Sequence, residues 1–263
     1  MDAHADCSCN LPHCCKTGGK IPLESILAEC DAHFNSGNPA AVGETLRRAL
    51  TLAQENGDAQ SELTLLNELM GHYRMAGDAD RGSAAVKSGF ALMRKLGLAG
   101  SVSAGTILIN GATALHSFGM FDAAAEAFDE AYRCYRAGLP ENDRKFAGLF
   151  NNMAAVYAEK NDFDRAENLY LQALEILSAP ADLMDYAVTC VNLAQLYCRR
   201  DPADPAVDTM LDAAMLAFDH PDAARDGYYA HSCSKCAGAF SDAGRGNDAA
   251  ELIKRSEAIY AGN

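Results

Sequence analysis

The stretch NNMAAVYAEKNDFDRAENLYLQALEI, residues 151–176, decides the fold. In its first half Ala154 and Tyr157 stand three positions apart, so a small residue and a ring share one side of a helix. The pair Asn161-Asp162 follows. Asn tolerates the left-handed conformation that ends a helix, and Asp is favoured where the next helix begins. The second half repeats apolar residues at the i, i+4, i+7 spacing of a helical stripe, namely Ala166, Tyr170 and Ala173. The stretch therefore predicts two helices joined by a short turn.

The same pattern recurs six times along the chain, at a spacing of 40 to 43 residues. A turn residue stands at the same place in each copy: Gly37, Gly77, Gly119, Asn161, Asp201 and Gly244. The second half of each copy carries a repeated core position, occupied by Leu46, Val86, Phe128, Tyr170, Met210 and Ile253. Such a unit buries its apolar face only against its neighbours, so we expect the copies to stack.

These columns predict one repeat domain, residues 21–263, behind a flexible Cys-rich tail at residues 1–20. The predicted repeats lie near residues 22–57, 58–98, 100–138, 141–179, 181–219 and 221–261.

The pattern of a small residue, a ring, a turn and an Ala-x-x-x-ring-x-x-Ala stripe resembles the tetratricopeptide repeat family. The long spacing is similar to that of kinesin light chain repeats, whose Asn-x-Ala-x-x-Tyr pattern is matched at residues 152–157 and 192–197. The resemblance implies an all-α fold, a right-handed superhelical solenoid of about six helix-turn-helix repeats. It also implies a concave side lined by the first helix of each repeat.

Composition agrees with a helical protein and limits its partners. The chain has 263 residues, of which 49% are hydrophobic, and its 22 Lys and Arg against 36 Asp and Glu give a net charge of −14. An acidic surface repels phosphate backbones and anionic lipids, so we expect neither nucleic acid nor membrane as a partner. Residues 1–10 contain no basic region and no apolar run, which predicts a cytoplasmic protein without a secretory signal.

The first helices carry a second, polar stripe that predicts a binding groove. Asn110, Asn152 and Asn192 are expected to form a ladder on the concave side, with Asn67 and Asn151 one helical position away. Amides donate and accept hydrogen bonds, which suits the backbone of a bound peptide. The alternative is that these amides bond to neighbouring helices and only hold the repeats in register. The predicted partner-binding residues are Asn67, Arg74, Asn110, Thr113, His116, Asn151, Asn152, Asn192, Gln195 and Arg199.

Arg74 and Arg199 are the only basic residues that we expect on this groove, so a repeated clamp for carboxylates is not predicted.

The ten cysteines fall into two groups. Cys30, Cys134, Cys190, Cys198, Cys233 and Cys236 occupy repeat positions, and we interpret them as small buried hydrophobic residues. A second group crowds the N-terminus, where thiolate and imidazole side chains would suit zinc or another thiophilic metal; its members are Cys7, Cys9, His13, Cys14 and Cys15. A thiol-rich tail without metal is the alternative, and no other cofactor is expected.

No enzyme motif is present: the sequence has no phosphate-binding glycine loop, no His-Glu-x-x-His and no nucleophile elbow. The first functional hypothesis is therefore a scaffold or adaptor that binds a protein or peptide in its groove. The alternatives are a metal-handling or redox protein whose repeats dock the N-terminal cluster, and a structural assembly factor or homo-oligomer that uses its outer face. The sequence predicts no oligomeric state.

Overall fold

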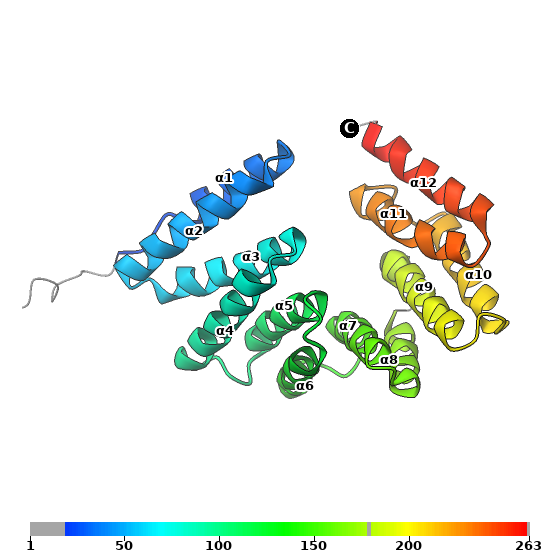
Figure 1. Cartoon of the computed structure of the whole chain (residues 1–263), viewed down its shortest axis with the longest axis horizontal. Helices are drawn as coiled ribbons and strands as arrows, with labels where there is room; N and C mark the ends of the chain where they lie inside the picture. The colour runs from blue at the N-terminus through cyan, green and yellow to red at the C-terminus, as the bar shows by residue number, and fades with distance from the viewer. Residues whose placement is uncertain (1–18, 178–179, 262–263) are drawn as a thin grey trace, which may run out of the picture. The chain divides into compact units, whose positions relative to one another are not determined.

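The computed structural model describes residues 19–177 and 180–261. In that part of the chain twelve α-helices and one short 3-10 helix (η1) account for all regular structure, and there is no β-strand, as the sequence predicts (Figure 1). The helices are α1 (Leu23–Asn35), α2 (Pro39–Asn56), α3 (Ala59–Ala76), α4 (Ala79–Lys95), α5 (Val102–Ser117), α6 (Phe121–Gly138), α7 (Lys145–Glu159), α8 (Phe163–Ile176), η1 (Pro180–Asp182), α9 (Leu183–Arg200), α10 (Ala206–Asp219), α11 (Gly227–Asp242) and α12 (Gly246–Ala261).

Each predicted repeat range contains one consecutive pair of these helices. The turns between the two helices of a pair follow from their residues: Gly77 has φ +67°, Gly244 has φ +76°, and Asn161 alone among the described non-glycine residues has a positive φ, of 60°. The next helix often begins at an aspartate that accepts a backbone hydrogen bond. Asp162, for example, accepts from the N–H of Arg165 at 3.3 Å.

The fifth turn is different from the other five. Asp201 was predicted at the position of a left-handed turn residue, but its φ of −152° and ψ of 110° are extended. Pro202 follows it, and a proline ring favours extended backbone in the residue before it. The connection is therefore longer, and α10 begins only at Ala206.

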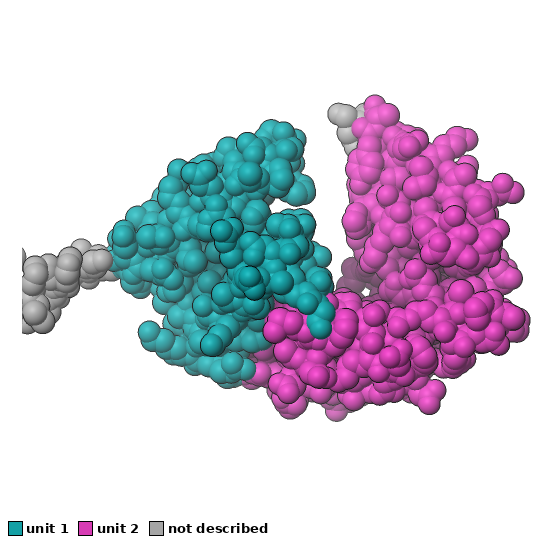
Figure 2. Space-filling view, viewed as in Figure 1, with its two compact units in different colours: residues 1–99, 117–119 teal, residues 100–116, 120–263 magenta. Residues whose placement is uncertain are grey.

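The helices form two compact units, coloured separately in Figure 2. The first comprises the described residues up to 99 together with 117–119. The second comprises 100–116 and the described residues from 120 onward. In the first unit Phe118 packs against Gly82, where a Cβ would lie 2.3 Å from the ring. The second unit contains α6 to α12 and nearly all of α5, and it holds the candidate site.

Inside the units the predicted core column is buried at most positions. The side chains of Leu46, Val86, Phe128 and Tyr170 are 1–4% exposed. Ile253 was expected to be equally buried, yet it is 39% exposed. It lies on α12, the last described helix.

Candidate functional site

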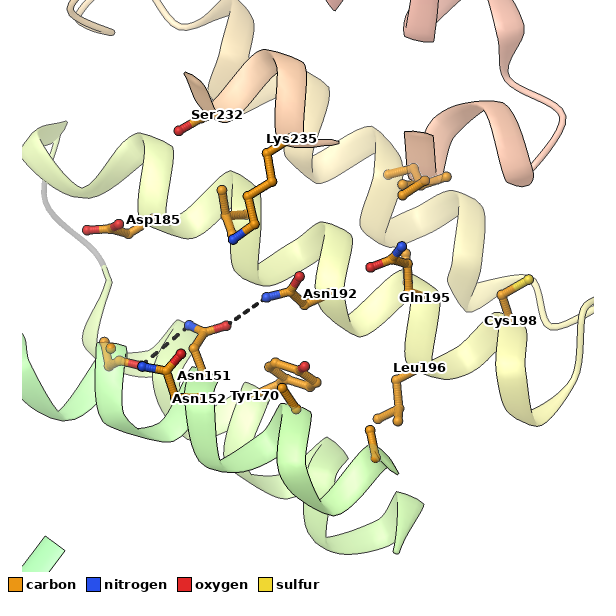
Figure 3. Close-up of a pocket in the computed structure, with 18 of the residues that line it drawn as sticks. Asn151, Asn152, Tyr170, Asp185, Asn192, Gln195, Leu196, Cys198, Ser232 and Lys235 are labelled. Atoms are coloured by element: carbon orange, nitrogen blue, oxygen red, sulfur yellow. Dashed lines mark hydrogen bonds between the residues drawn. The ribbon is translucent and has the colours of Figure 1, made fainter. Parts of the chain in front are cut away.

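A groove of about 900 Å³ opens in the second unit along one face of α7, α9 and α11, the first helices of three successive repeats (Figure 3). His116 of α5 also lines the groove. So do Tyr170 of α8, Leu177 at the C-terminal end of α8, and Val207 and Leu211 of α10. The remaining lining residues from the first helices include Arg144, Gly148, Asn151, Asn152, Glu159, Asp185, Val188, Asn192, Gln195, Arg199, Tyr228, His231, Lys235 and Asp242.

The same repeat positions supply the groove in each helix. Residues at a spacing of 40 to 43 stand in rows across α7, α9 and α11, and the central row is Asn152, Asn192 and Lys235. Small residues such as Gly148 and Ala155 leave room above α7. The geometry therefore follows from the repeat, because equivalent faces of stacked helices point to the same side.

Two of the groove amides are committed to bonds between helices. The Nδ2 of Asn151 donates to Thr189 Oγ1 at 2.6 Å, and Asn192 Nδ2 donates to Asn151 Oδ1 at 3.2 Å. Thr189 is fully buried, and it donates its own hydroxyl to the carbonyl of Asp185. These bonds join α7 to α9, so Asn151 and Asn192 hold two repeats in register, which was the alternative interpretation of the ladder.

We expect Asn151→Ala to lower the free energy of unfolding by about 1–2 kcal/mol, because it leaves the Asn192 amide and Thr189 without a partner between the helices. Urea unfolding measures this loss. Asn168→Ala on α8, whose amide bonds only to Gln172 one turn along the same exposed face, is the control and should change stability by less than about 0.5 kcal/mol. Equal effects of the two changes would contradict the bridging role.

The arginines of the groove are also neutralised within the protein. Arg199 donates to Glu159 Oε1 and to the carbonyl of Ala158, both at 2.9 Å. Arg144 lies 2.9 Å from Asp182 and 2.6 Å from Asp185. Because these guanidinium groups already have carboxylate partners, they contribute little net charge to the open space.

Five polar or charged side chains of the groove are clearly available: Asn152, Gln195, His231, Lys235 and Asp242. Each lines the groove, and none has a hydrogen bond or ion pair to another described residue. Figure 3 shows the Lys235 side chain extending from α11 over the groove. The groove thus offers two amides, an imidazole, one ammonium group and one carboxylate to a ligand.

Burial fixes the protonation of two other groove residues near neutral pH. It lowers the pKa of His116, and the nearby Glu159 carboxylate only partly opposes this, so the imidazole is neutral at pH 7. Burial raises the pKa of the Tyr170 phenol, so this side chain keeps its proton. Both groups therefore act as neutral hydrogen-bonding groups.

One segment of the chain matches a known family of repeats. The tetratricopeptide repeat model matches residues 149–184, which include most of α7, all of α8 and the start of α9. Over these residues the chain matches the tetratricopeptide repeat family. A second model, described as anaphase-promoting complex subunit 5, matches residues 25–78 and 99–141. No curated protein matches the sequence significantly.

Solved structures share the fold of this chain at low identity. BtubC (BKLC) from P. vanneervenii is 18% identical, with a TM-score of 0.55 and 92% of each chain covered. A putative kinesin light chain with TPR-like repeats from Podosopora anserina is 19% identical, with a TM-score of 0.52, 76% of this chain and 95% of the other covered. NprR in complex with its cognate peptide NprX is 14% identical, with a TM-score of 0.60, 89% of this chain and 66% of the other covered.

The groove of this repeat protein contains six of the ten predicted partner-binding residues: His116, Asn151, Asn152, Asn192, Gln195 and Arg199. Asn110 and Thr113 lie on α5 but do not line it, and the Thr113 hydroxyl donates to the carbonyl of Ile109. Asn67 and Arg74 belong to the first unit. That these residues bind a partner stays a prediction.

The expected set of basic residues was wrong, since Arg144 and Lys235 line the groove in addition to Arg199, and Arg74 does not. A ladder of asparagines does not include Lys235, although Lys235 lies 43 residues after Asn192 at the equivalent position. Arg144 is the N-cap residue of α7, so it lies just outside the polar stripe predicted within the first helix.

The cysteines at repeat positions are mostly buried, as predicted: Cys30, Cys134, Cys190, Cys233 and Cys236 are buried, and Cys198 is half-buried and lines the groove. Burial raises the pKa of Cys236 to about 12, which opposes formation of a reactive thiolate.

The predicted metal ligands Cys7, Cys9, His13, Cys14 and Cys15 lie outside the described residues, so metal binding there stays a prediction. Over residues 19–177 and 180–261, no group of three or more His, Cys, Asp or Glu side chains is placed to hold a metal ion. None of the described helices combines the length and apolarity that crossing a bilayer requires.

Proposed function

We propose that this repeat protein is a binding scaffold that holds a peptide segment of a partner protein across α7, α9 and α11. The observation that carries the proposal is the set of unpaired polar groups, Asn152, Gln195, His231 and Lys235, which open to one groove. The amides of Asn151 and Asn192 and the guanidinium groups of Arg144 and Arg199 already have internal partners, whereas a ligand can engage these four groups without breaking existing bonds.

The form of the groove supports a peptide as the ligand. Its free groups come from three successive helices, so an extended segment that crosses the helices meets them one after another. A cavity of about 900 Å³ is large enough for several residues of such a segment. NprR, whose fold is similar, is described in complex with a cognate peptide. We extend that mode of binding to this chain as part of the proposal.

Display of random dodecapeptides on the full chain, followed by affinity measurements with the selected peptides, tests the proposal. We expect the triple variant Asn152→Ala, Gln195→Ala, Lys235→Ala to bind them at least about 30-fold more weakly. Three lost hydrogen bonds at about 0.5–1.5 kcal/mol each, with tenfold in affinity per 1.4 kcal/mol, give an effect of this size.

The control is Lys254→Ala on α12, which removes the same charge from a side chain that is 80% exposed and outside the groove. It should leave the affinity unchanged. Failure to select any peptide, or selection of peptides that bind the triple variant and the wild type equally, would overturn the proposed function.

A further inference from the structure

Two side chains of α11 leave opposite charges unpaired in the groove. Lys235 and Asp242 both line it, and neither has a hydrogen bond or ion pair to another described residue. They stand seven residues apart on one face of the helix, with Ala239 between them, so they are separated by about 10 Å along the axis. No ion pair joins them at this separation, and the space between them is open to a ligand.

The other ionised groups of the groove are neutralised within the protein. Arg144 pairs with Asp185, and Arg199 pairs with Glu159. Among the Lys, Arg, Asp and Glu side chains that line the groove, the two without a partner are therefore both on α11. The unpaired charge of the groove is concentrated on one of its three helices, with a cation on one side and an anion on the other.

Asp242 stands where a carboxylate weakens its own helix. It is the last residue of α11, and the C-terminal end of a helix carries a partial negative charge. Glu159 ends α7 in the same way, but Arg199 neutralises it at 2.9 Å. Asp219 ends α10, and Arg255 lies 2.7 Å from it. Asp242 has no such cation, so neither the stability of its helix nor an internal ion pair accounts for its charge.

An extended segment that crosses α11 lies between these two charges. The proposed ligand crosses α7, α9 and α11 in turn, so Lys235 is on one of its sides and Asp242 is on the other. Successive side chains of an extended chain point to opposite sides. Two neighbouring residues of the ligand can therefore reach the two charges, an acidic residue toward Lys235 and a basic residue toward Asp242.

We infer that the groove selects a peptide in which an acidic and a basic residue are neighbours, held at α11 between Lys235 and Asp242. This inference rests on the proposed function and adds the sequence class of the ligand. A peptide with these two charges exchanged meets a like charge on each side, which discriminates against it. Lys235 and Asp242 thus determine specificity, whereas the amides of Asn152 and Gln195 bind without regard to charge.

Exchange of the charges on both partners tests the inference. The probes are dodecapeptides selected on the full chain, each compared with a copy in which the acidic and basic neighbours are exchanged and the other residues are kept. We expect the wild type to bind the exchanged copy at least about 10-fold more weakly, because two attractions become two repulsions. The variant Lys235→Glu, Asp242→Lys has the wild-type net charge and should show the reverse preference.

The matched control is Lys254→Glu, Glu257→Lys. It exchanges one cation and one anion on an exposed part of α12 outside the groove, and it also keeps the net charge of the chain. This variant should retain the preference of the wild type. Because all four substituted side chains are exposed, we expect circular dichroism to show both variants folded.

Asp242→Asn separates binding from a structural role. Removing a negative charge from the C-terminal end of α11 should leave the midpoint of thermal unfolding unchanged or slightly higher. The affinity for the selected peptides should nevertheless fall by about 3- to 5-fold, the size of one exposed ion pair. A lower midpoint with unchanged affinity would show that the carboxylate serves the fold, and it would overturn the inference.

The outcomes separate this inference from the proposed function. Selected peptides that need the groove but lack neighbouring opposite charges, or bind equally well after the exchange, would overturn charge selection and leave the scaffold function intact. The same holds if the variant Lys235→Glu, Asp242→Lys keeps the wild-type preference. Absence of any groove-dependent binding would overturn both.

Discussion

Phe146→Ala should unfold at a markedly lower temperature than the wild type. Phe146 of α7 is 1% exposed and contacts three other rings, with centroid distances of 6.0 Å to Tyr132, 5.8 Å to Tyr135 and 5.9 Å to Phe150. Removing a buried phenyl group leaves a cavity and loses these aromatic pairs, at a cost of about 3–5 kcal/mol. For a chain of this size that corresponds to a fall in Tm of roughly 6–20 °C.

Calorimetry or thermal circular dichroism measures the change, and Phe34→Ala serves as the control. Phe34 of α1 is 61% exposed, so its truncation should cost less than about 0.5 kcal/mol. If Phe146→Ala lost no more than Phe34→Ala, the ring cluster would not be the joint between the third and fourth repeats.

A second large effect is expected where two helices pack through a glycine. A Cβ placed on Gly105 of α5 would lie 2.7 Å from the ring of Tyr135 and 3.2 Å from the Cβ of Cys134. The Tyr135 ring is also held by Phe146, and its hydroxyl lies 3.1 Å from Thr106 Oγ1, so it has little freedom to move. Gly105→Leu should therefore destabilise the protein by about 3 kcal/mol.

Gly238→Leu is the matched substitution at an open position. Gly238 lies inside α11, and a Cβ at this residue would have nothing within 4 Å, so leucine should only improve helix propensity and stabilise by about 0.7 kcal/mol. Urea denaturation of both variants compares the two sites directly. Opposite signs are the expected result, and destabilisation of similar size at both positions would show that the close approach of α5 and α6 is not what distinguishes Gly105.

The sequence predicted the fold well because the repeat encodes it redundantly. A glycine or asparagine stands at five of the six turns. A departure from the pattern at one position therefore affects the predicted structure of only one repeat. The prediction failed locally at two positions: Pro202 imposed extended backbone on Asp201, and Ile253 on α12 is exposed. A comparison of equivalent residues in the six repeats reveals neither difference.

The site was less predictable because one helical position separates structural from available amides. Asn151 and Asn152 are neighbours in sequence, yet Asn151 bonds to α9 while Asn152 faces the groove without a partner. Successive side chains on a helix point in directions about 100° apart. The position of the neighbouring helix therefore decides which of the two amides forms a bond to it. Tyr170 was not predicted as a groove residue for a different reason. The repeat position that it occupies predicts burial, which is correct for the ring, but the residue also lines the groove.

Amide hydrogen exchange on the full chain, with and without a selected dodecapeptide, tests the central claim most directly. We predict added protection in peptides from α7, α9 and α11, residues 145–159, 183–200 and 227–242, with little change in α10 and α12. Protection confined to the second helices, or to the unit built from α1 to α4, would contradict a groove formed by the first helices.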